Sequence, residues 1–265
     1  MRLVQYRAQG HTQLGVVSRG RVVDVKTAAA NAGTDGAPFH STLDLPDAGP
    51  EALEFVRALS GDDQAIPLQE AQLGFPVTAR KIVAIGLNYL DHSKEAGMPV
   101  PGAPLCFAKF TSSLSGGFDP IRLPAEDAEV DFEGELGVMI GCKVHSVSEA
   151  EAMECVAGYV TFNDVSARRR QFTDGQWTRG KSCDTLSPNG PYLVTRDEVP
   201  DPGNLRITTR VNGEVMQDSS TRQFILGVSQ VIAQLYTSFT FYPGDITATG
   251  TPPGVGFSRQ PPRLL

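Results

Sequence analysis

The sequence lacks the features of a membrane, secreted or nucleic-acid-binding protein. No run approaches the roughly 20 consecutive apolar residues that a membrane helix needs, and the opening MRLVQYRAQG has no apolar core like that of a secretory signal. Acidic residues outnumber basic ones by 30 to 23, and the net charge of -7 disfavours nucleic acid and anionic membrane as partners. We therefore expect a cytoplasmic protein, in which an anionic substrate would need locally placed positive charge or a metal.

The few cysteines also lack a pattern. Cys106, Cys142, Cys155 and Cys183 show no CxxC spacing, so free thiols in a cytosolic protein are the default interpretation. Cys142 and His145 alone are only a weak indication of zinc, because no second pair of ligands accompanies them. Glycine (27) and proline (19) are abundant by contrast, which indicates many turns and a β-rich chain.

The length of 265 residues suits one or two domains, and 40% hydrophobic with 20% charged residues is typical of a globular protein. Residues 1–75 are predicted to form a small N-terminal α/β domain, and residues 76–265 the catalytic domain. Predicted strands are Arg2–Tyr6, Gln13–Ser18, Arg21–Val25, Lys81–Ile85, Leu105–Lys109, Val130–Ile140, Gly158–Asn163 and the hairpin Arg206–Val211/Glu214–Gln217; predicted helices are Pro50–Leu59, Glu149–Val156 and Phe224–Phe239.

The stretch VDFEGELGVMI, Val130–Ile140, is the most informative part of the chain. With the two-residue period of a strand, Asp131, Glu133 and Glu135 share one face, while the opposite face is apolar. A row of like charges is unfavourable unless the charges meet water or a cation. Carboxylate oxygens are the ligands of hard divalent cations, and two that alternate along a strand can reach the same ion. The alternative is a solvated acidic strand face.

A histidine and a glutamate follow the predicted strand Lys81–Ile85. His92 and Glu95 are three residues apart, so one helical turn would place them on the same face. A histidine held by a carboxylate is a general base near neutral pH, whereas the alternative is an incidental pair on an exposed turn. Glycines and prolines around this pair predict a lid over residues 88–104 that is mobile without ligand and orders over substrate.

A third carboxylate, Asp164, follows the predicted strand Gly158–Asn163, where sheets often place functional groups, although an N-cap is the competing interpretation. The glycine-rich loop GDITATGTPPGVG lacks the Lys-Ser/Thr of a phosphate-binding loop, and we expect it to present backbone N–H groups and the Thr251 hydroxyl to a carboxylate. The region after Asp164 holds basic and polar side chains that could neutralise an anionic substrate, or that form a basic surface loop in the case of Arg169 and Arg170. These side chains are Arg168, Arg169, Arg170, Gln171, Trp177, Arg179 and Lys181.

From about Lys81 to the end, the chain resembles the fumarylacetoacetate hydrolase family. The resemblance rests on six motifs in the family's order and at its spacing, each weak alone and highly specific together. They are GLNYLDHSKE, DFEGELGVMIG, GYVTFNDVSAR with Gln171, RGKSCDTLSPNGPYL, VNGEVMQ and GDITATGTPPGVG. The resemblance implies an α+β, mostly β fold with a mixed β-roll or barrel-like catalytic domain that forms homodimers. Residues 1–75 match only as the usual small leading domain.

The resemblance also implies which residues form the metal site and the base. Glu133, Glu135 and Asp164 match the family's three ligands of a divalent metal, which is Mg²⁺ with Mn²⁺ and Ca²⁺ as alternatives. His92 and Glu95 match the pair that activates water or moves a proton. These five residues, together with Lys181, form the predicted metal and catalytic centre.

Further matches concern the substrate. Lys181 resembles the active-site lysine of the family, and Arg168 and Gln171 match positions that contact substrate. Thr251 matches the loop that grips a carboxylate, and we add Lys109, at the end of a predicted strand, to the substrate-binding residues.

Two departures from the family pattern stand out. Position 169, which is often acidic in relatives, is Arg169 here, so local ion pairing and substrate preference should differ. The chain stops at Leu265, where relatives generally continue, so this member is expected either to lack those residues as given or to close its sheet differently.

The predicted function is divalent-metal-dependent hydrolysis of a C–C bond in a 2,4-diketo acid such as an acylpyruvate or fumarylacetoacetate. Glu95 would orient His92, which would deprotonate a water for attack on the distal carbonyl, while Lys181 would stabilise negative charge or protonate the leaving carbon. The first alternative is isomerisation of a 2-hydroxymuconate-type acid or decarboxylation of a 2-oxo diacid. The second alternative is a catalytically silent binding protein. The presence of His92, Glu95 and Lys181 argues against it, because a protein that only binds needs no base. The predicted partner is a small anionic 2-oxo acid.

Overall fold

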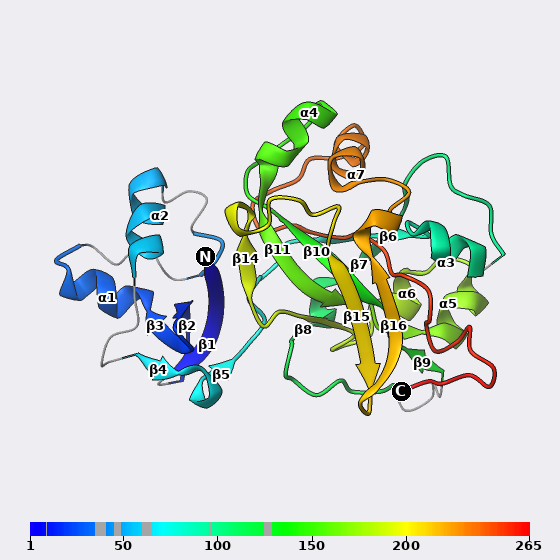
Figure 1. Ribbon diagram of the computed structural model, residues 1–265, viewed down its shortest axis with the longest axis horizontal. Helices are drawn as coiled ribbons and strands as arrows, with labels where there is room; N and C mark the ends of the chain where they lie inside the picture. The colour runs from blue at the N-terminus through cyan, green and yellow to red at the C-terminus, as the bar shows by residue number, and fades with distance from the viewer. Residues whose placement is uncertain (9, 35–40, 45–48, 60–64, 96, 125–128) are drawn as a thin grey trace.

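The chain folds into a sheet-rich α+β structure, seen here in a computed structural model that describes residues 1–8, 10–34, 41–44, 49–59, 65–95, 97–124 and 129–265 (Figure 1). The strands are β1 (Arg2–Ala8), β2 (His11–Ser18), β3 (Arg21–Asp24), β4 (Ile66–Pro67), β5 (Gln72–Leu73), β6 (Ile82–Gly86), β7 (Leu105–Lys109), β8 (Leu114–Gly116), β9 (Val130–Asp131), β10 (Gly134–Ile140), β11 (Val156–Asn163), β12 (Ser166–Ala167), β13 (Ser187–Asn189), β14 (Leu193–Thr195), β15 (Arg206–Val211), β16 (Glu214–Ser220) and β17 (Ile246–Ala248). The helices are α1 (Val25–Asn31), α2 (Gly49–Ala58), α3 (Leu90–Glu95), α4 (Glu149–Ala152), α5 (Arg168–Asp174), α6 (Thr178–Lys181) and α7 (Val228–Leu235). Short 3₁₀ turns are Leu68–Glu70, Thr111–Ser113, Met153–Cys155, Arg196–Glu198 and Thr221–Gln223.

One long mixed sheet organises these elements. Its strands run in the order β4-β3-β2-β1-β14-β11-β10-β17-β6-β7, with β17 parallel to β6 and the other neighbours along this path antiparallel. The predicted mixed, mostly β architecture is therefore confirmed. Among the described strands no pairing joins β4 to β7, so the order is open rather than closed into a barrel. No described helix is long and apolar enough to cross a membrane.

The leading segment extends this same sheet. β1 pairs with β14 through Leu3 and Leu193, so strands β1 to β4 continue the strand order of the rest of the sheet, at the left of Figure 1. A tight turn joins β2 and β3, with Arg19 and Gly20 both at positive φ. Helix α1 was not predicted from the sequence; at its start, Asp24 caps the helix by accepting the Thr27 N–H. The boundary near residue 75 stays a prediction.

The predicted acidic strand Val130–Ile140 is two strands, because its halves choose different partners. β9 pairs with β12 in a separate small sheet, whereas β10 lies between β11 and β17 in the long one. At the break, the Glu133 N–H donates to the Asn163 side chain (2.9 Å) instead of a ladder carbonyl. Asp131, Glu133 and Glu135 are all buried, so the alternative of a solvated acidic face is wrong.

Two further predictions near the end of the chain need correction. The helix predicted over Phe224–Phe239 begins only at Val228, because the N–H groups of Ile225 and Leu226 bond to Asn88 instead. The glycine-rich loop also contains a strand, β17, which its threonines and glycines concealed. α7 still packs by its predicted apolar face, with Val228, Val231, Ile232 and Leu235 in the core beside β10 and β11.

The hydrogen bonds of Asn88 also limit the predicted lid. Its side-chain amide donates to the Leu226 and Thr249 carbonyls at 3.1 and 2.9 Å, and the next residue, Tyr89, is fully buried. Residues 88–89 are therefore anchored, and a moving segment would have to begin after them. Ala96 lies outside the described residues.

A buried carboxylate joins the start of β6 to the start of β17. Asp245 is inaccessible to solvent, lies 2.6 Å from the Lys81 ammonium and accepts the Tyr242 N–H at 2.7 Å. Replacing Asp245 by alanine removes the ion-pair partner of Lys81 and the acceptor of the Tyr242 N–H. We expect this loss to lower the free energy of unfolding by about 2–3 kcal/mol. Thermal denaturation of Asp245→Ala should show a clearly lowered Tm. Asp218→Ala, which breaks an exposed pair with Arg206, is the control and should melt like the parent; equal melting of both variants would contradict the role given to Asp245.

Candidate active site

Three carboxylates converge where the central strands end. Glu133 immediately precedes β10, Glu135 is its second residue, and Asp164 follows β11. The pairing of Gly134 with Asn163 brings the two strand ends together, and the Asp164 N–H donates to the Glu133 carbonyl at 2.9 Å. One oxygen from each carboxylate lies within 4.8 Å of the others, and all three side chains are buried. The register of a single strand pair thus produces the predicted triad, and Asp164 caps no helix.

Two lysines contact this triad. The Lys181 ammonium lies 2.8 Å from Glu133 and 2.8 Å from Asp164. The Lys109 ammonium lies 2.5 Å from the other oxygen of Asp164 and donates to the Leu186 carbonyl at 3.0 Å. Lys109 is fully buried against Asp164 and does not line the pocket described below, so its assignment to substrate binding stays a prediction.

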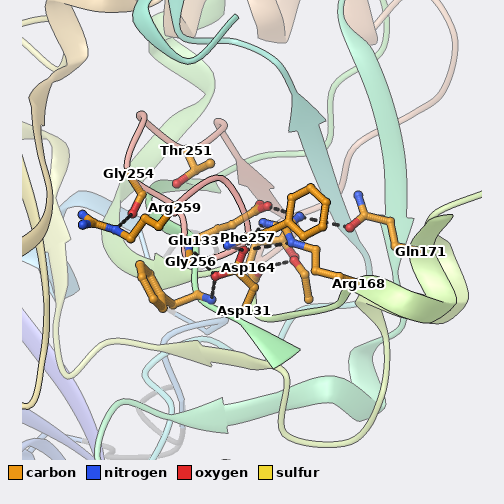
Figure 2. A network of polar contacts seen from close by, with 12 residues as sticks. Asp131, Glu133, Asp164, Arg168, Gln171, Thr251, Gly254, Gly256, Phe257 and Arg259 are labelled. Carbon is orange, nitrogen blue, oxygen red and sulfur yellow. Dashed lines mark hydrogen bonds and ion pairs between the residues drawn. The ribbon is translucent and has the colours of Figure 1, made fainter. Parts of the chain in front are cut away.

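An arginine closes the network on its other side (Figure 2). The Arg168 Nε and Nη2 donate to Asp131 at 2.9 and 2.7 Å, and Nη1 lies 2.7 Å from Glu133. Nη1 also donates to the side-chain amide oxygen of Gln171 at 3.0 Å. Asp131 was predicted to share a strand face with Glu133 and Glu135. Its carboxylate binds Arg168, so we do not count it as a fourth metal ligand.

The C-terminal loop is fixed by the same carboxylates. Asp131 accepts the N–H groups of Gly256 at 2.7 Å and Phe257 at 3.1 Å. Glu135 accepts the Gly250 N–H at 2.8 Å, where a φ of +100° requires glycine. The predicted loop thus presents its backbone N–H groups to carboxylates, but to those of the protein itself.

The charges in this cluster do not balance. Burial alone would raise the pKa of Glu133, yet Lys181 and Arg168 outweigh it and hold that pKa down at about 2. Burial raises the pKa of Glu135 well above its usual value, and the Asp164 and Glu133 carboxylates add to that rise. Among the described residues, Glu135 has no ion-pair partner, so three ligands face only two lysines once Arg168 is assigned to Asp131.

That uncompensated negative charge fits a divalent cation. Hard oxygen donors at mutually close range are the ligands that Mg²⁺, Mn²⁺ and Ca²⁺ prefer. Glu133, Glu135 and Asp164 provide such a set, and a divalent ion would turn the local excess of one negative charge into an excess of one positive charge. A bound substrate carboxylate would then restore neutrality.

The predicted histidine–glutamate pair is also formed. α3 places His92 Nδ1 3.0 Å from Glu95 Oε2, and Glu95 in turn accepts the Gly254 N–H at 3.0 Å. Burial alone would raise the pKa of Glu95, but the hydrogen bonds from His92 and Gly254 lower it, so Glu95 stays ionised. With Nδ1 engaged, Nε2 is the ring nitrogen left for a substrate.

The pair and the ion cluster meet at one pocket of about 300 Å³. His92, Glu133, Arg168, Gln171, Lys181 and Thr251 all line it, as does Trp177, whose ring packs edge-on against Phe107 at 5.2 Å. The complete lining is Ile85, Gly86, Leu87, His92, Met98, Phe107, Glu133, Arg168, Gln171, Phe172, Trp177, Lys181, Thr251, Val255, Phe257 and Ser258.

The Thr251 hydroxyl is already engaged within the protein. It donates to the Gly134 carbonyl at 3.0 Å and accepts from the Gln217 amide at 2.8 Å. Its proton is therefore committed, and Thr251 lines the pocket without offering a free donor. Gln217, which also accepts the Gly134 N–H at 3.0 Å, was missed from the sequence because nothing in its hairpin points to a site far along the chain.

The remaining arginines lie outside the pocket. Arg169 is exposed on α5, and Arg179 pairs with Asp174 on the surface, while Arg170 donates to the Cys183 sulfur at 3.3 Å. Arg169 is therefore a surface residue, but it lies on helix α5 and not in a loop, and the acids that pair with its neighbour Arg168 are Asp131 and Glu133.

Known proteins are similar to this chain over most of its length. The family model for the fumarylacetoacetate (FAA) hydrolase C-terminal domain matches residues 81–265. The chain belongs to the fumarylacetoacetate hydrolase family. Across its full length it is 42% identical to the mitochondrial oxaloacetate tautomerase Fahd2a of Rattus norvegicus, covering 85% of that protein.

Solved structures of other family members share the fold over nearly the whole chain. Fumarylacetoacetate hydrolase from Exiguobacterium antarcticum superposes with a TM-score of 0.83 at 33% identity, covering 100% of this chain and 91% of that one. The 5-carboxymethyl-2-hydroxymuconate delta-isomerase from Mycobacterium smegmatis gives 0.76 at 31% identity, covering 97% and 89%. The protein is thus an enzyme of the fumarylacetoacetate hydrolase superfamily, whose relatives are named for tautomerisation, hydrolysis and isomerisation.

The charge imbalance makes a prediction about Glu135→Gln. Without metal, this variant should melt above the parent, because it removes a buried carboxylate that has no cation while the amide oxygen can still accept the Gly250 N–H. Since the Glu135 pKa is raised, the carboxyl becomes neutral as pH falls, so the gap in Tm should widen with rising pH.

The same variant should bind Mg²⁺ or Mn²⁺ far more weakly in calorimetry, and Mg²⁺ should raise its Tm little. Glu149→Gln, a change of the same kind on the exposed helix α4, is the control for both measurements. Parent-like affinity for Mg²⁺ in Glu135→Gln would remove Glu135 from the ligand set.

Proposed function

We propose that the protein is a divalent-metal-dependent enzyme that moves a proton beside the 2-oxo group of a small 2-oxo acid, interconverting its keto and enol forms. The observation that carries this proposal is the placement of an oriented base, His92, at the same pocket as Glu133 of the carboxylate triad and Lys181. An ion held by Glu133, Glu135 and Asp164 would supply Lewis acidity at the substrate's 2-oxo and carboxylate oxygens.

The protein's own residues then account for the proton transfer. His92 Nε2 takes a proton from the carbon next to the 2-oxo group, and Glu95, held ionised, stabilises the imidazolium that forms. Lys181, whose positive charge is favoured by Asp164 and Glu133 despite burial, lies at the triad where negative charge develops on oxygen. Transfer of the proton from His92 to the oxygen of the former 2-oxo group gives the enol. The same steps in reverse give the ketone.

Hydrolysis of a 2,4-diketo acid is the second candidate, favoured by the likeness to the Exiguobacterium antarcticum hydrolase over the whole chain. In that reaction His92 would deprotonate a water, whose oxygen adds to the distal carbonyl carbon. The C–C bond then breaks to give a carboxylic acid and the enolate of a 2-oxo acid, which takes up a proton. We place proton transfer first because the tautomerase Fahd2a matches the full length of this chain at 42% identity.

A protein that binds a small acid without catalysis would not need an oriented His92 side chain. Glu95 is fixed both by His92 and by the Gly254 N–H, an arrangement that orients one ring nitrogen and adds nothing to holding an anion. The proposal keeps Mg²⁺ as the metal, a homodimer as the assembly and the cytoplasm as the location; curated relatives include the mitochondrial Fahd2a and bacterial proteins.

His92→Ala separates the base from the metal site. It should lower turnover by about 10²–10⁴-fold, or roughly 3–5 kcal/mol of barrier, while Mg²⁺-dependent binding of oxalate persists. Enolisation of oxaloacetate is followed by its ultraviolet absorbance, and cleavage of acetylpyruvate by product NMR. Glu95→Gln should lose less, since the imidazole remains.

His145→Ala is the matched control, because His145 is exposed on the same domain and away from the pocket. It should retain full activity. Near-normal turnover by His92→Ala would overturn the role of His92 as base, and cleavage without enolisation would place hydrolysis first.

A further inference from the structure

The pocket lining contains two chemically different kinds of side chain. Glu133, Arg168 and Lys181 are charged, and they are the groups assigned above to the metal and the head of the substrate. The rest of the lining includes large apolar side chains, and three of them are half exposed: Met98 (48%), Phe172 (54%) and Phe257 (47%). Large apolar groups exposed together at a concave site mark a place where another apolar surface binds.

Phe172 and Phe257 are both positioned by residues of the charged network, Arg168 and Asp131. Phe172 follows Arg168 by one helical turn in α5, so the two side chains are neighbours on one face. Phe257 is fixed through its backbone, because its N–H donates to Asp131 at 3.1 Å. The two rings contact each other with centroids 5.1 Å apart, and they come from segments far apart in the sequence.

The cations that line this pocket are already paired. Arg168 contacts Asp131 and Glu133, and Lys181 contacts Glu133 and Asp164. With a divalent ion on the triad, one substrate carboxylate neutralises the cluster. A second carboxylate at the far end of the substrate would meet Phe172 and Phe257 and would lose water without gaining an ionic partner among the described lining residues.

We infer that Phe172 and Phe257, with Met98, form a subsite for an apolar distal group, so that the preferred substrate is a 2-oxo acid with one carboxylate and an aryl or alkyl end. This inference rests on the proposed function, because it takes the head of the substrate to lie at the triad. It separates the chain from its relatives named for oxaloacetate, a 2-oxo acid with two carboxylates. The two rings act here as specificity-determining residues.

Calorimetry in the presence of Mg²⁺ tests the inference with a matched pair of ligands. 2-Oxo-4-phenylbutanoate and 2-oxoglutarate share the 2-oxo acid head and differ in a phenyl group or a carboxylate at the far end; oxalate represents the head alone. The parent should bind 2-oxo-4-phenylbutanoate at least about tenfold more tightly than 2-oxoglutarate. Phe172→Ala should lose most of that preference and bind oxalate like the parent, and Phe172→Arg should favour 2-oxoglutarate.

Phe118→Ala is the control, since Phe118 is 73% exposed and lies outside the pocket lining. Equal or tighter binding of 2-oxoglutarate by the parent, with oxalate bound normally, would overturn the subsite alone. A Phe172→Ala variant that weakens all three ligands equally and changes sedimentation would make Phe172 a subunit contact and also overturn it. Absence of Mg²⁺-dependent oxalate binding would overturn the metal chemistry of the proposed function and the subsite with it.

Discussion

Negative charge that the protein buries without neutralising it is the constraint on which the rest of this structure depends. Burying Glu133, Glu135 and Asp164 together is strongly unfavourable, and Lys109 and Lys181 offset only part of it. The raised pKa of Glu135, caused by burial and by its two neighbours, identifies where the compensation fails. A buried site with one uncompensated negative charge favours a cation. A divalent ion would change that net charge to one positive charge, which one substrate carboxylate would neutralise.

Strand pairing in the long sheet positions the backbone segments that carry these carboxylates. β10 lies between β11 and β17, so the three segments that carry Glu135, Asp164 and Gly250 emerge side by side. The early end of β9 leaves Asp131 free of the long sheet, where it can hold Arg168 and the C-terminal loop at once. One set of carboxylates therefore both forms the candidate metal site and positions the loop that completes the pocket.

The sequence carried the local part of this arrangement. Alternation along Val130–Ile140 identified Glu133 and Glu135, and the spacing of His92 and Glu95 predicted their contact, because both depend on residues that are close in sequence. The split of that strand was not predictable, since it follows from the partners that β9 and β10 choose elsewhere in the chain.

The same limit explains the side chains whose surroundings differ from expectation. A strand pattern shows that Lys109 alternates with its neighbours but not that Asp164 covers it, and the Thr251 hydroxyl is committed by Gly134 and Gln217, which are distant in sequence. The contact between Phe172 and Phe257 is of this kind too. Long-range contacts of this sort decide how a site is lined, whereas local periodicity decides which chemistry it contains.

This division also separates chemistry from specificity within the pocket. The triad is built at the ends of paired strands, where a change of one residue in register would reverse every side chain, so its geometry tolerates little variation. Phe172 and Phe257 project from a short helix and a loop whose backbones are held through Arg168 and Asp131, not through the rings themselves. The two rings can therefore be exchanged without removing a charge from the cluster.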